Sequence, residues 1–467
     1  MSVIRVDRKD FATHMPVVVI GGGGAGLTAA LSAQDAGAAV LVVERDPTTL
    51  GSTAMSSSLL PAAGTRFQRE AGVDDSPEQF LADILRQTRG QTDVAVARAV
   101  AEASAEAIEW LADVPKLPLT LMPGPHYPGH SKLRMHSTPN RNGQDLMGAL
   151  SRAAAETDLP LLTEAIVTDL YADASGRILG LRYRRPDGTT DDVGCDVLVL
   201  ACGGFGGNPA LVAKHIPEMA AQPFFGHTGN KGDALLWGEA LGAAVADLGA
   251  FQGHGGLAYG HNIPILWPMI LLGGFQVNAR GERFGDEGRG PVEHAPDVAA
   301  QPGGVAWTIF DAARHEFMQT YDDYRSAMSA GCIVTGASWD ELAGKLGLPA
   351  DALQRTADTV AQAKAGALAD PFGRTYAGAH PLAAPYYGVK VTAALFHTQG
   401  GVRIDGQARV LRVDGSRFPN LFAAGGAARG ISGPSYWGYM PGNGLISAFV
   451  IGRMAGLSAA RQALALR

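Results

Sequence analysis

Two short apolar runs near the start of the chain enclose a glycine-rich turn and a segment of helical length. The first run covers residues 17–20 (VVVI), and the second covers residues 40–43 (VLVV) and ends at Glu44. Apolar runs without polar alternation are typical of strands that are buried on both faces of a parallel sheet. The pattern therefore predicts a strand–helix–strand unit over residues 17–44.

The turn after the first run has the G-x-G-x-x-G spacing at Gly21, Gly23 and Gly26. The first glycine permits the tight turn, the second lets the backbone approach a pyrophosphate, and the third lets the helix pack closely on the strand. The pyrophosphate would bind the free N–H groups of a helix that starts near Gly24. Glu44 is placed to accept hydrogen bonds from a ribose diol. Such glycines alone follow many buried strands, but strand, helix, second strand and acid in this order predict dinucleotide binding.

Periodicity predicts further elements along the chain. In residues 75–112, N-cap signals precede apolar residues at helical spacing, which predicts helices. Prolines and glycines predict a loop over residues 115–130. Alternating apolar and polar residues over 159–200, with Asp187-Gly188 between them, predict strands joined by a hairpin turn.

Length and charge limit the possible classes of protein. At 467 residues the chain is too long for one simple core, which predicts two domains. A net charge of −7, with both signs interspersed, argues against a nucleic-acid-binding surface. The three cysteines lack metal-ligand spacing, which predicts small buried residues in a reducing compartment and no metal site. Residues 1–15 lack an apolar signal region, and glycines interrupt the apolar stretch 17–43, so we expect a cytoplasmic protein without a membrane span.

Two later strands end in small residues, as the first one does. Residues 196–200 lead into Ala201-Cys202-Gly203-Gly204, and residues 420–422 lead into a second run that contains Gly425. The chain thus returns to one nucleotide-binding sheet from three places, whereas an enzyme that uses a nicotinamide cofactor usually keeps its nucleotide domain contiguous. Between about residues 250 and 392 the sequence changes to aromatic and proline-rich loops, followed by a predicted helix near 350–366, which indicates an inserted domain.

In these and several further segments, the chain resembles the succinate dehydrogenase/fumarate reductase flavoprotein family. Its soluble branch includes ketosteroid dehydrogenases, urocanate reductases and tricarballylate dehydrogenases. The resemblance covers nearly the whole chain and rests on motifs in a fixed order: the fingerprint, Gly51-Ser52-Thr53, the A-x-G-G-F strand end, Gly232-Asp233, Val277-Asn278 with Gly281-Glu282-Arg283-Phe284, His397-Thr398-Gln399-Gly400-Gly401, Gly442-Asn443-Gly444 and Gly452-Arg453-Met454-Ala455-Gly456.

The resemblance implies an α/β fold, in which a Rossmann-like FAD-binding domain carries an inserted α+β capping domain that holds the substrate. The FAD-binding domain would comprise residues 1–249 and 393–467, and the capping domain residues 250–392. FAD would be noncovalent, because no histidine lies near Ser52, where membrane-bound relatives attach it. The implied FAD-binding residues are Gly21, Gly23, Gly24, Ala25, Gly26, Glu44, Arg45, Gly51, Ser52, Thr53, Ser57, Ser58, Ala201, Gly203, Gly204, Asp233, Gly425, Asn443, Gly444, Leu445 and Ile446.

Two positions depart from the family pattern around the flavin. Ser58 stands where relatives tend to have glycine, which puts the local backbone path in question. Gly426 stands where many flavoproteins of this type carry an acid for the ribityl chain. That contact is therefore either absent or supplied by another residue.

Four residues are candidates for catalysis. His397 matches the histidine of the family's H-T-x-G-G segment, which in fumarate reductases contacts a substrate carboxylate. Arg289 is a candidate proton donor, although fumarate reductases carry their proton-delivering arginine a little further on, and Glu287 has the same status. A histidine at a strand end and a solvated loop arginine are the competing interpretations. Tyr439 is the fourth candidate.

The C-terminal segment departs most clearly from fumarate reductases. Those enzymes hold the second carboxylate with an arginine before the final glycines, whereas residues 432–444 here contain no basic residue. Tyr439, followed by Pro441-Gly442, instead resembles the ketosteroid dehydrogenases, in which a tyrosine hydroxyl and a backbone N–H polarise a ketone.

The leading hypothesis is therefore an FAD-dependent dehydrogenase that acts on a CH–CH bond beside a carbonyl and desaturates a ketone, most suitably a cyclic one. The alternatives are reduction or dehydrogenation of a carboxylate, and a flavin-binding carrier or sensor without turnover. In the first two cases the protein binds a small carbonyl or carboxylate compound and exchanges electrons with a further donor or acceptor.

Overall fold

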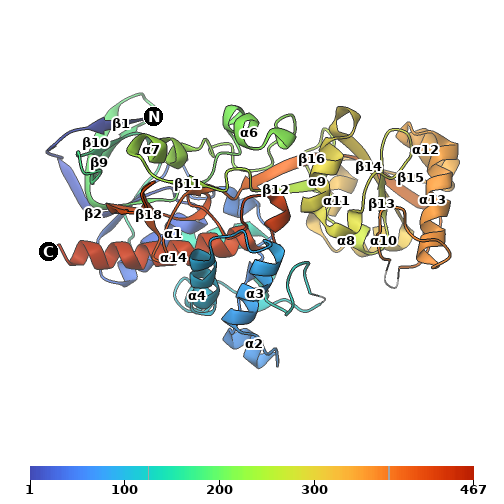
Figure 1. Ribbon diagram of the computed structural model, residues 1–467, viewed down its shortest axis with the longest axis horizontal. Helices are drawn as coiled ribbons and strands as arrows, with labels where there is room; N and C mark the ends of the chain where they lie inside the picture. The colour runs from blue at the N-terminus through green and yellow to red at the C-terminus, as the bar shows by residue number, and fades with distance from the viewer. Residues whose placement is uncertain (125, 377–378, 467) are drawn as a thin grey trace. The chain divides into compact units, whose positions relative to one another are not determined.

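The computed structural model describes residues 1–124, 126–376 and 379–466. The described chain forms two compact units. Unit 1 comprises residues 1–215, 226–251 and 397–467, and unit 2 comprises residues 216–225 and 252–396. Figure 1 shows the elements of both units along the chain.

Unit 1 is built on a nine-stranded sheet, in which the order β1-β8-β9-β10-β2-β3-β7 is extended by β19 beside β10 and β18 beside β19. Its strands are β1 (Ser2–Arg5), β2 (Thr13–Ile20), β3 (Val40–Val43), β7 (Leu161–Leu162), β8 (Ile166–Ala172), β9 (Ile178–Arg184), β10 (Thr190–Leu200), β18 (Arg409–Leu411) and β19 (Arg417–Ala423). Smaller sheets in the same unit contain β4 (Leu60–Pro61), β5 (Thr120–Leu121), β6 (Met135–Ser137), β11 (Val245–Ala246) and β17 (Gly401–Val402).

The centre of the large sheet is parallel and fully buried. Strand β2 lies between β3 and β10, and β10 pairs with β19 beyond it, all in the parallel sense. Residues 17–19 have no exposed surface, which explains why the run contains no polar alternation. The predicted strand–helix–strand unit is confirmed, because β2 and β3 flank helix α1 (Gly24–Asp35).

The helices of unit 1 are α1, α2 (Arg66–Glu70), α3 (Pro77–Gln87), α4 (Val94–Asp113), α5 (Gly143–Glu156), α6 (Pro209–His215), α7 (Asp233–Leu241) and α14 (Asn443–Leu464). Helix α14 packs closely on α1 because glycines face it: a Cβ on Gly452 would lie 2.6 Å from the carbonyl oxygen of Ala25, and one on Gly456 would lie 2.1 Å from that of Ala29. By length and composition α14 could cross a membrane, but 67% of its most apolar window is buried inside the protein, as expected for a core helix.

Most of the local expectations from the sequence are confirmed. Ser76 caps α3 and Asp93 caps α4, so the predicted helical region is two helices. The turn at Asp187-Gly188 joins the antiparallel strands β9 and β10. The loop predicted for residues 115–130 is interrupted by β5, which pairs with β6. A two-residue strand of this kind has no periodicity that sequence analysis could detect.

Unit 2 has its own sheet of five strands, in the order β12-β16-β14-β13 with β15 beside β16. These strands are β12 (Phe251–Ala258), β13 (Phe275–Val277), β14 (Val305–Asp311), β15 (Ile333–Gly336) and β16 (Tyr386–Thr398). Its helices are α8 (Pro268–Leu271), α9 (Pro291–Ala299), α10 (Ala312–Met318), α11 (Asp322–Ser329), α12 (Trp339–Leu346) and α13 (Ala350–Lys364), the last of which was predicted near 350–366. Helices α12 and α13 share an apolar core with β13 and β14, and α9 and α11 lie on the other side of this sheet (Figure 1).

Unit 2 overlaps the inserted segment predicted at 250–392 but has other bounds, since its main part covers residues 252–396. Residues 216–225 also belong to it, because their last part pairs with β16: the Phe225 N–H donates to the carbonyl of Leu395 at 2.8 Å. This contact joins segments far apart in the chain, and neither segment has a sequence pattern that reveals it.

Candidate active site

The glycine turn between β2 and α1 has the geometry that the fingerprint predicts. Gly21 has a φ of +104°, and a Cβ there would lie 2.5 Å from the carbonyl oxygen of Ala201. A Cβ on Gly26 would lie 1.8 Å from the carbonyl oxygen of Gly21, so only glycine lets α1 approach the strand. Gly23, by contrast, faces open space, with no atom within 4 Å of its Cβ position. That space, at a helix N-terminus without a side-chain cap, suits a pyrophosphate.

Glu44 follows β3 and turns its carboxylate back to the glycine turn. One oxygen accepts the Gly22 N–H at 2.5 Å, and the other accepts the Asp46 N–H at 2.9 Å. Burial raises the pKa of Glu44, although the two backbone N–H groups act in the opposite direction. The carboxylate is therefore held in place beside Gly22, where the sequence predicts the ribose.

The run of small residues after Gly51 packs against the start of α1. Its 3₁₀ turn spans Ser52–Met55, and the Thr53 hydroxyl accepts the Gly24 N–H at 3.2 Å. Ser58 has a φ of +52°, the left-handed conformation that glycine favours, so the chain here follows a glycine-like path. Its hydroxyl is bonded to Ser137 and Thr138 and has no exposed surface.

The ends of the three central strands meet around α1. A Cβ on Gly425 would lie 2.9 Å from that of Ala25, and Gly204 is so close to Thr398 that a Cβ there would lie 2.1 Å from its hydroxyl. Arg45 and Asp233 form an ion pair at 2.6 Å. Residues predicted from distant parts of the chain to bind one cofactor are thus neighbours in space.

The start of α14 contributes an unsatisfied polar atom to the same region. Asn443 is fully buried, and its Oδ1 has no hydrogen-bond partner among the described residues. Buried acceptors of this kind are rarely left unpaired, so a bound group with a donor fits here. The open space at Gly23, the fixed carboxylate of Glu44 and this atom together fit a dinucleotide cofactor.

Tyr439 and His397, which are far apart in the sequence, are in contact. Their rings pack edge to face with centroids 5.7 Å apart. Burial lowers the pKa of His397 to about 4, although the Thr398 carbonyl raises it, so the imidazole is neutral at physiological pH. Burial also raises the pKa of Tyr439 well above its ordinary value, although backbone groups of Gly442 and Gly444 lower it. The pair therefore presents uncharged groups.

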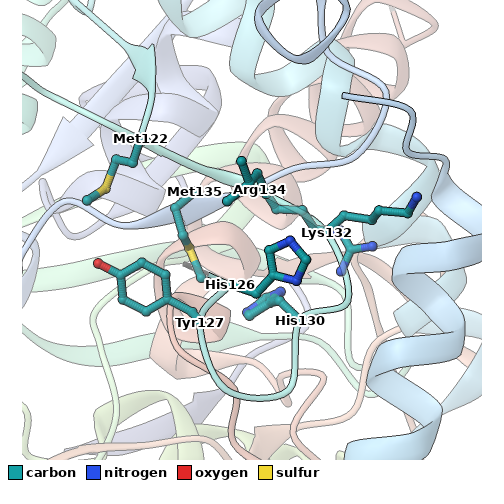
Figure 2. A pocket seen from close by; sticks show the side chains of 8 residues that line it. Met122, His126, Tyr127, His130, Lys132, Arg134 and Met135 are labelled. Carbon is teal, nitrogen blue, oxygen red and sulfur yellow. The ribbon is translucent and has the colours of Figure 1, made fainter. Parts of the chain in front are cut away.

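The segment that carries Tyr439 is held from both sides. The Gln87 amide donates to the Trp437 carbonyl at 2.8 Å, and the His130 Nε2–H donates to the Pro441 carbonyl at 3.0 Å. His130 belongs to the loop that lines the hollow in Figure 2, with Met122, His126, Tyr127, Lys132, Leu133, Arg134 and Met135. Sequence analysis did not single out Gln87 or His130, because neither belongs to a motif.

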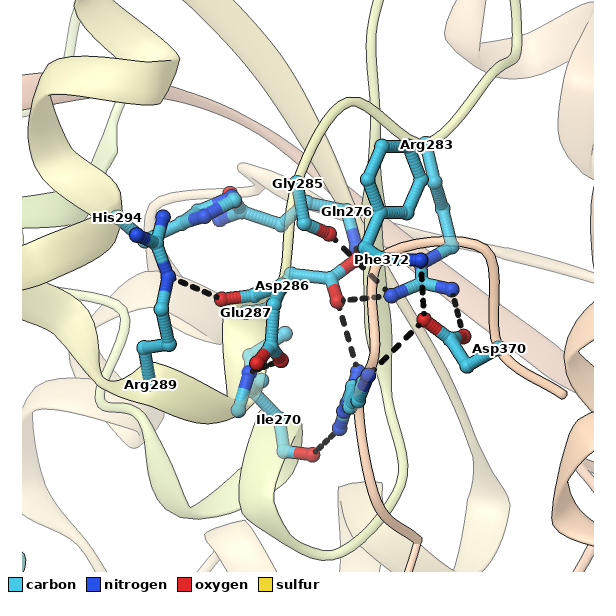
Figure 3. A network of polar contacts seen from close by, with 12 residues as sticks. Ile270, Gln276, Arg283, Gly285, Asp286, Glu287, Arg289, His294, Asp370 and Phe372 are labelled. Atoms are coloured by element: carbon cyan, nitrogen blue, oxygen red, sulfur yellow. Dashed lines mark hydrogen bonds and ion pairs between the residues drawn. The ribbon is translucent and has the colours of Figure 1, made fainter.

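Glu287 and Arg289 lie on one 3₁₀ turn of unit 2 but in different environments (Figure 3). Glu287 has no exposed surface and pairs with Arg283 at 2.7 Å and Arg374 at 3.1 Å. Burial raises its pKa, but the Arg283 guanidinium outweighs this effect, so the net shift is downward. Arg289 is exposed and forms an ion pair with Asp297. The Glu287 carboxylate therefore forms ion pairs with two arginines. The catalytic roles of Glu287 and Arg289 stay predictions.

Comparison with known proteins assigns the chain to a family. The FAD binding domain family matches residues 16–445. The chain is 31% identical over 450 residues to an NADH:fumarate oxidoreductase of Klebsiella pneumoniae, covering 96% of this chain and 48% of that protein. The chain belongs to the FAD binding domain family.

Two solved structures share the fold over almost the whole chain. The open conformation of a flavocytochrome c3 fumarate reductase has a TM-score of 0.84 and 28% identity, and the match covers 97% of this chain and 79% of that one. The 3-ketosteroid-Δ4-(5α)-dehydrogenase from Rhodococcus jostii RHA1, solved with 4-androstene-3,17-dione, has a TM-score of 0.78 and 25% identity, covering 98% and 100%. The chain spans about half the length of the Klebsiella relative.

Membership of this family makes the chain an FAD-dependent oxidoreductase, which confirms the predicted cofactor, fold class and resemblance. The residues around Gly23, Glu44 and Asn443 would hold FAD. Which atoms contact it stays a prediction for each residue named from the sequence.

The structure adds one candidate residue, His254 on β12 of unit 2. Its ring stacks on Phe396 at 5.2 Å and meets Trp267 edge to face at 5.7 Å. Burial lowers its pKa to about 4, although the Gly256 backbone raises it. These contacts place the His254 ring in an aromatic cluster of unit 2. A lone histidine among glycines gave no such signal in the sequence.

Proposed function

We propose that this flavoprotein oxidises a CH–CH bond beside a carbonyl, and that its substrate is a ketone, most suitably a cyclic one. The observation that carries the proposal is the uncharged pair formed by Tyr439, which is buried, and His397, which is partly buried. Neutral donors stabilise a carbonyl oxygen, whereas a buried carboxylate requires a cationic partner. The absence of a basic residue from 432–444 points the same way.

Desaturation transfers a proton from the α carbon to a general base and removes a hydride from the β carbon. Bound FAD supplies the hydride acceptor. As the α proton leaves, negative charge develops on the carbonyl oxygen, and donors fixed beforehand at that oxygen stabilise the transition state more than the ground state. The Tyr439 hydroxyl and His397 would be these donors. Because Tyr439 is buried and His397 is partly buried, water would weaken their interaction with the developing charge less than at an exposed site.

One alternative is conversion of an unsaturated or saturated carboxylate. The identity with a fumarate oxidoreductase and the TM-score of 0.84 with a fumarate reductase favour it. Under this alternative Arg289 would deliver the proton and His397 would contact a carboxylate. A carrier or sensor without turnover is the remaining alternative.

Three further predictions belong to the proposal. Residues 250–392 would close over the substrate, while 1–249 and 393–467 hold FAD. The reduced flavin would pass its electrons to a separate acceptor. The protein would act in the cytoplasm.

The test is anaerobic bleaching of the flavin's visible absorbance by a panel of cyclic ketones, succinate and other saturated carboxylates. Bleaching by a ketone and not by carboxylates supports the proposal. Bleaching by succinate alone, or reoxidation of the reduced flavin by fumarate alone, supports the carboxylate alternative. A flavin that no compound reduces or reoxidises would favour the carrier.

A further inference from the structure

A chain of hydrogen bonds runs from the start of α14 to the His397 ring. The Gln399 Nε2 lies 2.6 Å from His397 Nδ1, and the Gln399 Oε1 accepts the Ser432 hydroxyl at 3.0 Å. The Asn443 amide donates to the Ser432 oxygen at 3.4 Å. Gln399, Ser432 and Asn443 are all buried. These contacts join three segments of unit 1 behind the imidazole.

The hydrogen bonds in this series fix which end of the Gln399 amide faces Ser432 and which end faces His397. The Ser432 hydroxyl donates its proton to the carbonyl oxygen of Gln399 at 3.0 Å, and the longer contact of the Asn443 amide with the Ser432 oxygen agrees with this direction. The amide nitrogen of Gln399 then faces His397 and donates to Nδ1. A neutral imidazole has one N–H, so an acceptor at Nδ1 places the proton on Nε2.

One contact of the ring favours the opposite tautomer. The Thr398 carbonyl lies 3.4 Å from Nδ1, and it would require a proton there. That contact is at the limit of hydrogen bonding, whereas the Gln399 contact is short. The Gln399 amide also lies 3.4 Å from Nε2, so its principal contact is with Nδ1. The geometry therefore favours Nδ1 as the acceptor.

We propose that Gln399 is a positioning residue that holds His397 in the tautomer with its proton on Nε2, so that Nε2–H is a donor to the substrate carbonyl beside the Tyr439 hydroxyl. The role of the Nε2–H toward the substrate carbonyl rests on the proposed function. A Cβ on Gly444 would lie 2.4 Å from Cε1 and 2.7 Å from Nε2, so glycine at this position lets the start of α14 pack closely on this edge of the ring. His397 thereby acts as a neutral donor and not as a cation.

The direct test is nitrogen-15 NMR of the FAD-loaded protein with labelled histidine, in which His397→Asn assigns the signal. We expect an unprotonated Nδ1 and a protonated Nε2 in the wild type. Gln399→Glu replaces the donor at Nδ1 with an acceptor, so the proton should move to Nδ1. Gln399→Met removes the donor at similar length, and both tautomers should then be populated. Gln407→Glu makes the same chemical change at an exposed glutamine and should leave the His397 signal unchanged.

Kinetic measurements on the same variants test whether the tautomer of His397 matters for the reaction with the substrate. With a substrate that bleaches the flavin, Gln399→Met should lower kcat/KM about twofold, because the donor tautomer is then one of two with similar populations. Gln399→Glu should lower it by about 10²-fold or more, as loss of a transition-state donor does. Flavin content and the thermal midpoint of unfolding show whether each variant folds. Ser432→Ala removes the hydroxyl that orients Gln399, so it should also populate both tautomers of His397.

A protonated Nδ1 in the wild type, or an unchanged tautomer in both Gln399 variants, would overturn the proposal. Tautomer shifts without any change in kcat/KM would overturn the substrate half of it. Because the NMR signals need no substrate, a flavin that no ketone bleaches would refute the proposed function and leave the assignment of the tautomer standing.

Discussion

Replacement of Tyr439 by phenylalanine removes one hydroxyl from a buried site and leaves the ring against His397. The side chain is 6% exposed, and burial keeps its pKa above the ordinary value, so the hydroxyl remains a donor throughout the working pH range. Loss of one such donor costs about 10²–10³ in kcat, or about 2.7–4 kcal/mol. We expect kcat and kcat/KM to fall together, because the bond strengthens only as charge develops on the carbonyl oxygen.

The assay is flavin reduction by the ketone that bleaches the wild type, followed under anaerobic conditions by stopped-flow absorbance. Tyr436→Phe is the matched control, because Tyr436 lies on the adjacent 3₁₀ turn and packs its ring against Phe251 at 5.5 Å. The control should change the rate by less than about twofold, and both variants should retain FAD. A Tyr439→Phe enzyme with a wild-type rate of reduction, or with a changed KM alone, would refute the assignment of the hydroxyl to the transition state.

Three further predictions test the remaining parts of the structure. Gly23→Val should abolish FAD binding, because the side chain would occupy the open space at the turn, and a yellow variant would contradict this. Acid should release FAD from the wild type, and flavin that stays with the denatured protein would contradict noncovalent binding. Glu287→Gln should cost about 3–5 kcal/mol in urea unfolding, since it removes the carboxylate partner of the buried Arg374 and leaves Arg283 with Asp370 alone as its ion-pair partner among the described residues. Because the folded pKa of Glu287 is lowered, its contribution is present above the ordinary glutamate pKa and is lost as pH falls through the folded one. His130→Phe should lower kcat about tenfold by freeing the Pro441 carbonyl, and His130→Gln should restore part of it; equal rates in both variants would exclude a role for that hydrogen bond.

The nucleotide-binding part of the fold could be predicted because its signals are local. The buried runs, the glycine spacing and the acid at Glu44 lie within one strand–helix–strand unit, and each has a steric reason to occur there. Gly26 shows this directly, since a Cβ would lie 1.8 Å from the Gly21 carbonyl oxygen. Residues 216–225 could not be assigned to unit 2, because their place depends on pairing with β16 across the sequence.

The candidate site was only partly predictable for the same reason. Motif resemblance pointed to His397 and Tyr439, but their contact is a property of the folded chain. Glu287 and Arg289 are two residues apart, yet one has no exposed surface and the other faces solvent. Gln399 occupies a variable position of its motif, so its bond to His397 has no sequence signal at all.

The charge of the site decides between a ketone and a carboxylate as the substrate. A dicarboxylate would bring two negative charges into a site where His397 is neutral and 432–444 lacks a basic residue, and an unpaired buried charge costs several kcal/mol. If the substrate is nevertheless a dicarboxylate, the Arg289 cation and a hydrogen bond from His397 must carry its binding. His397→Ala and Arg289→Ala should then be severe, and Tyr439→Phe should matter little. If it is a ketone, Tyr439→Phe is severe and Arg289→Ala, at an exposed ion pair, should change the rate by less than about twofold. Fumarate reduction or succinate oxidation that survives loss of the tyrosine hydroxyl and fails without Arg289 would exclude the ketone, because the two substrate classes require opposite electrostatics from the same site.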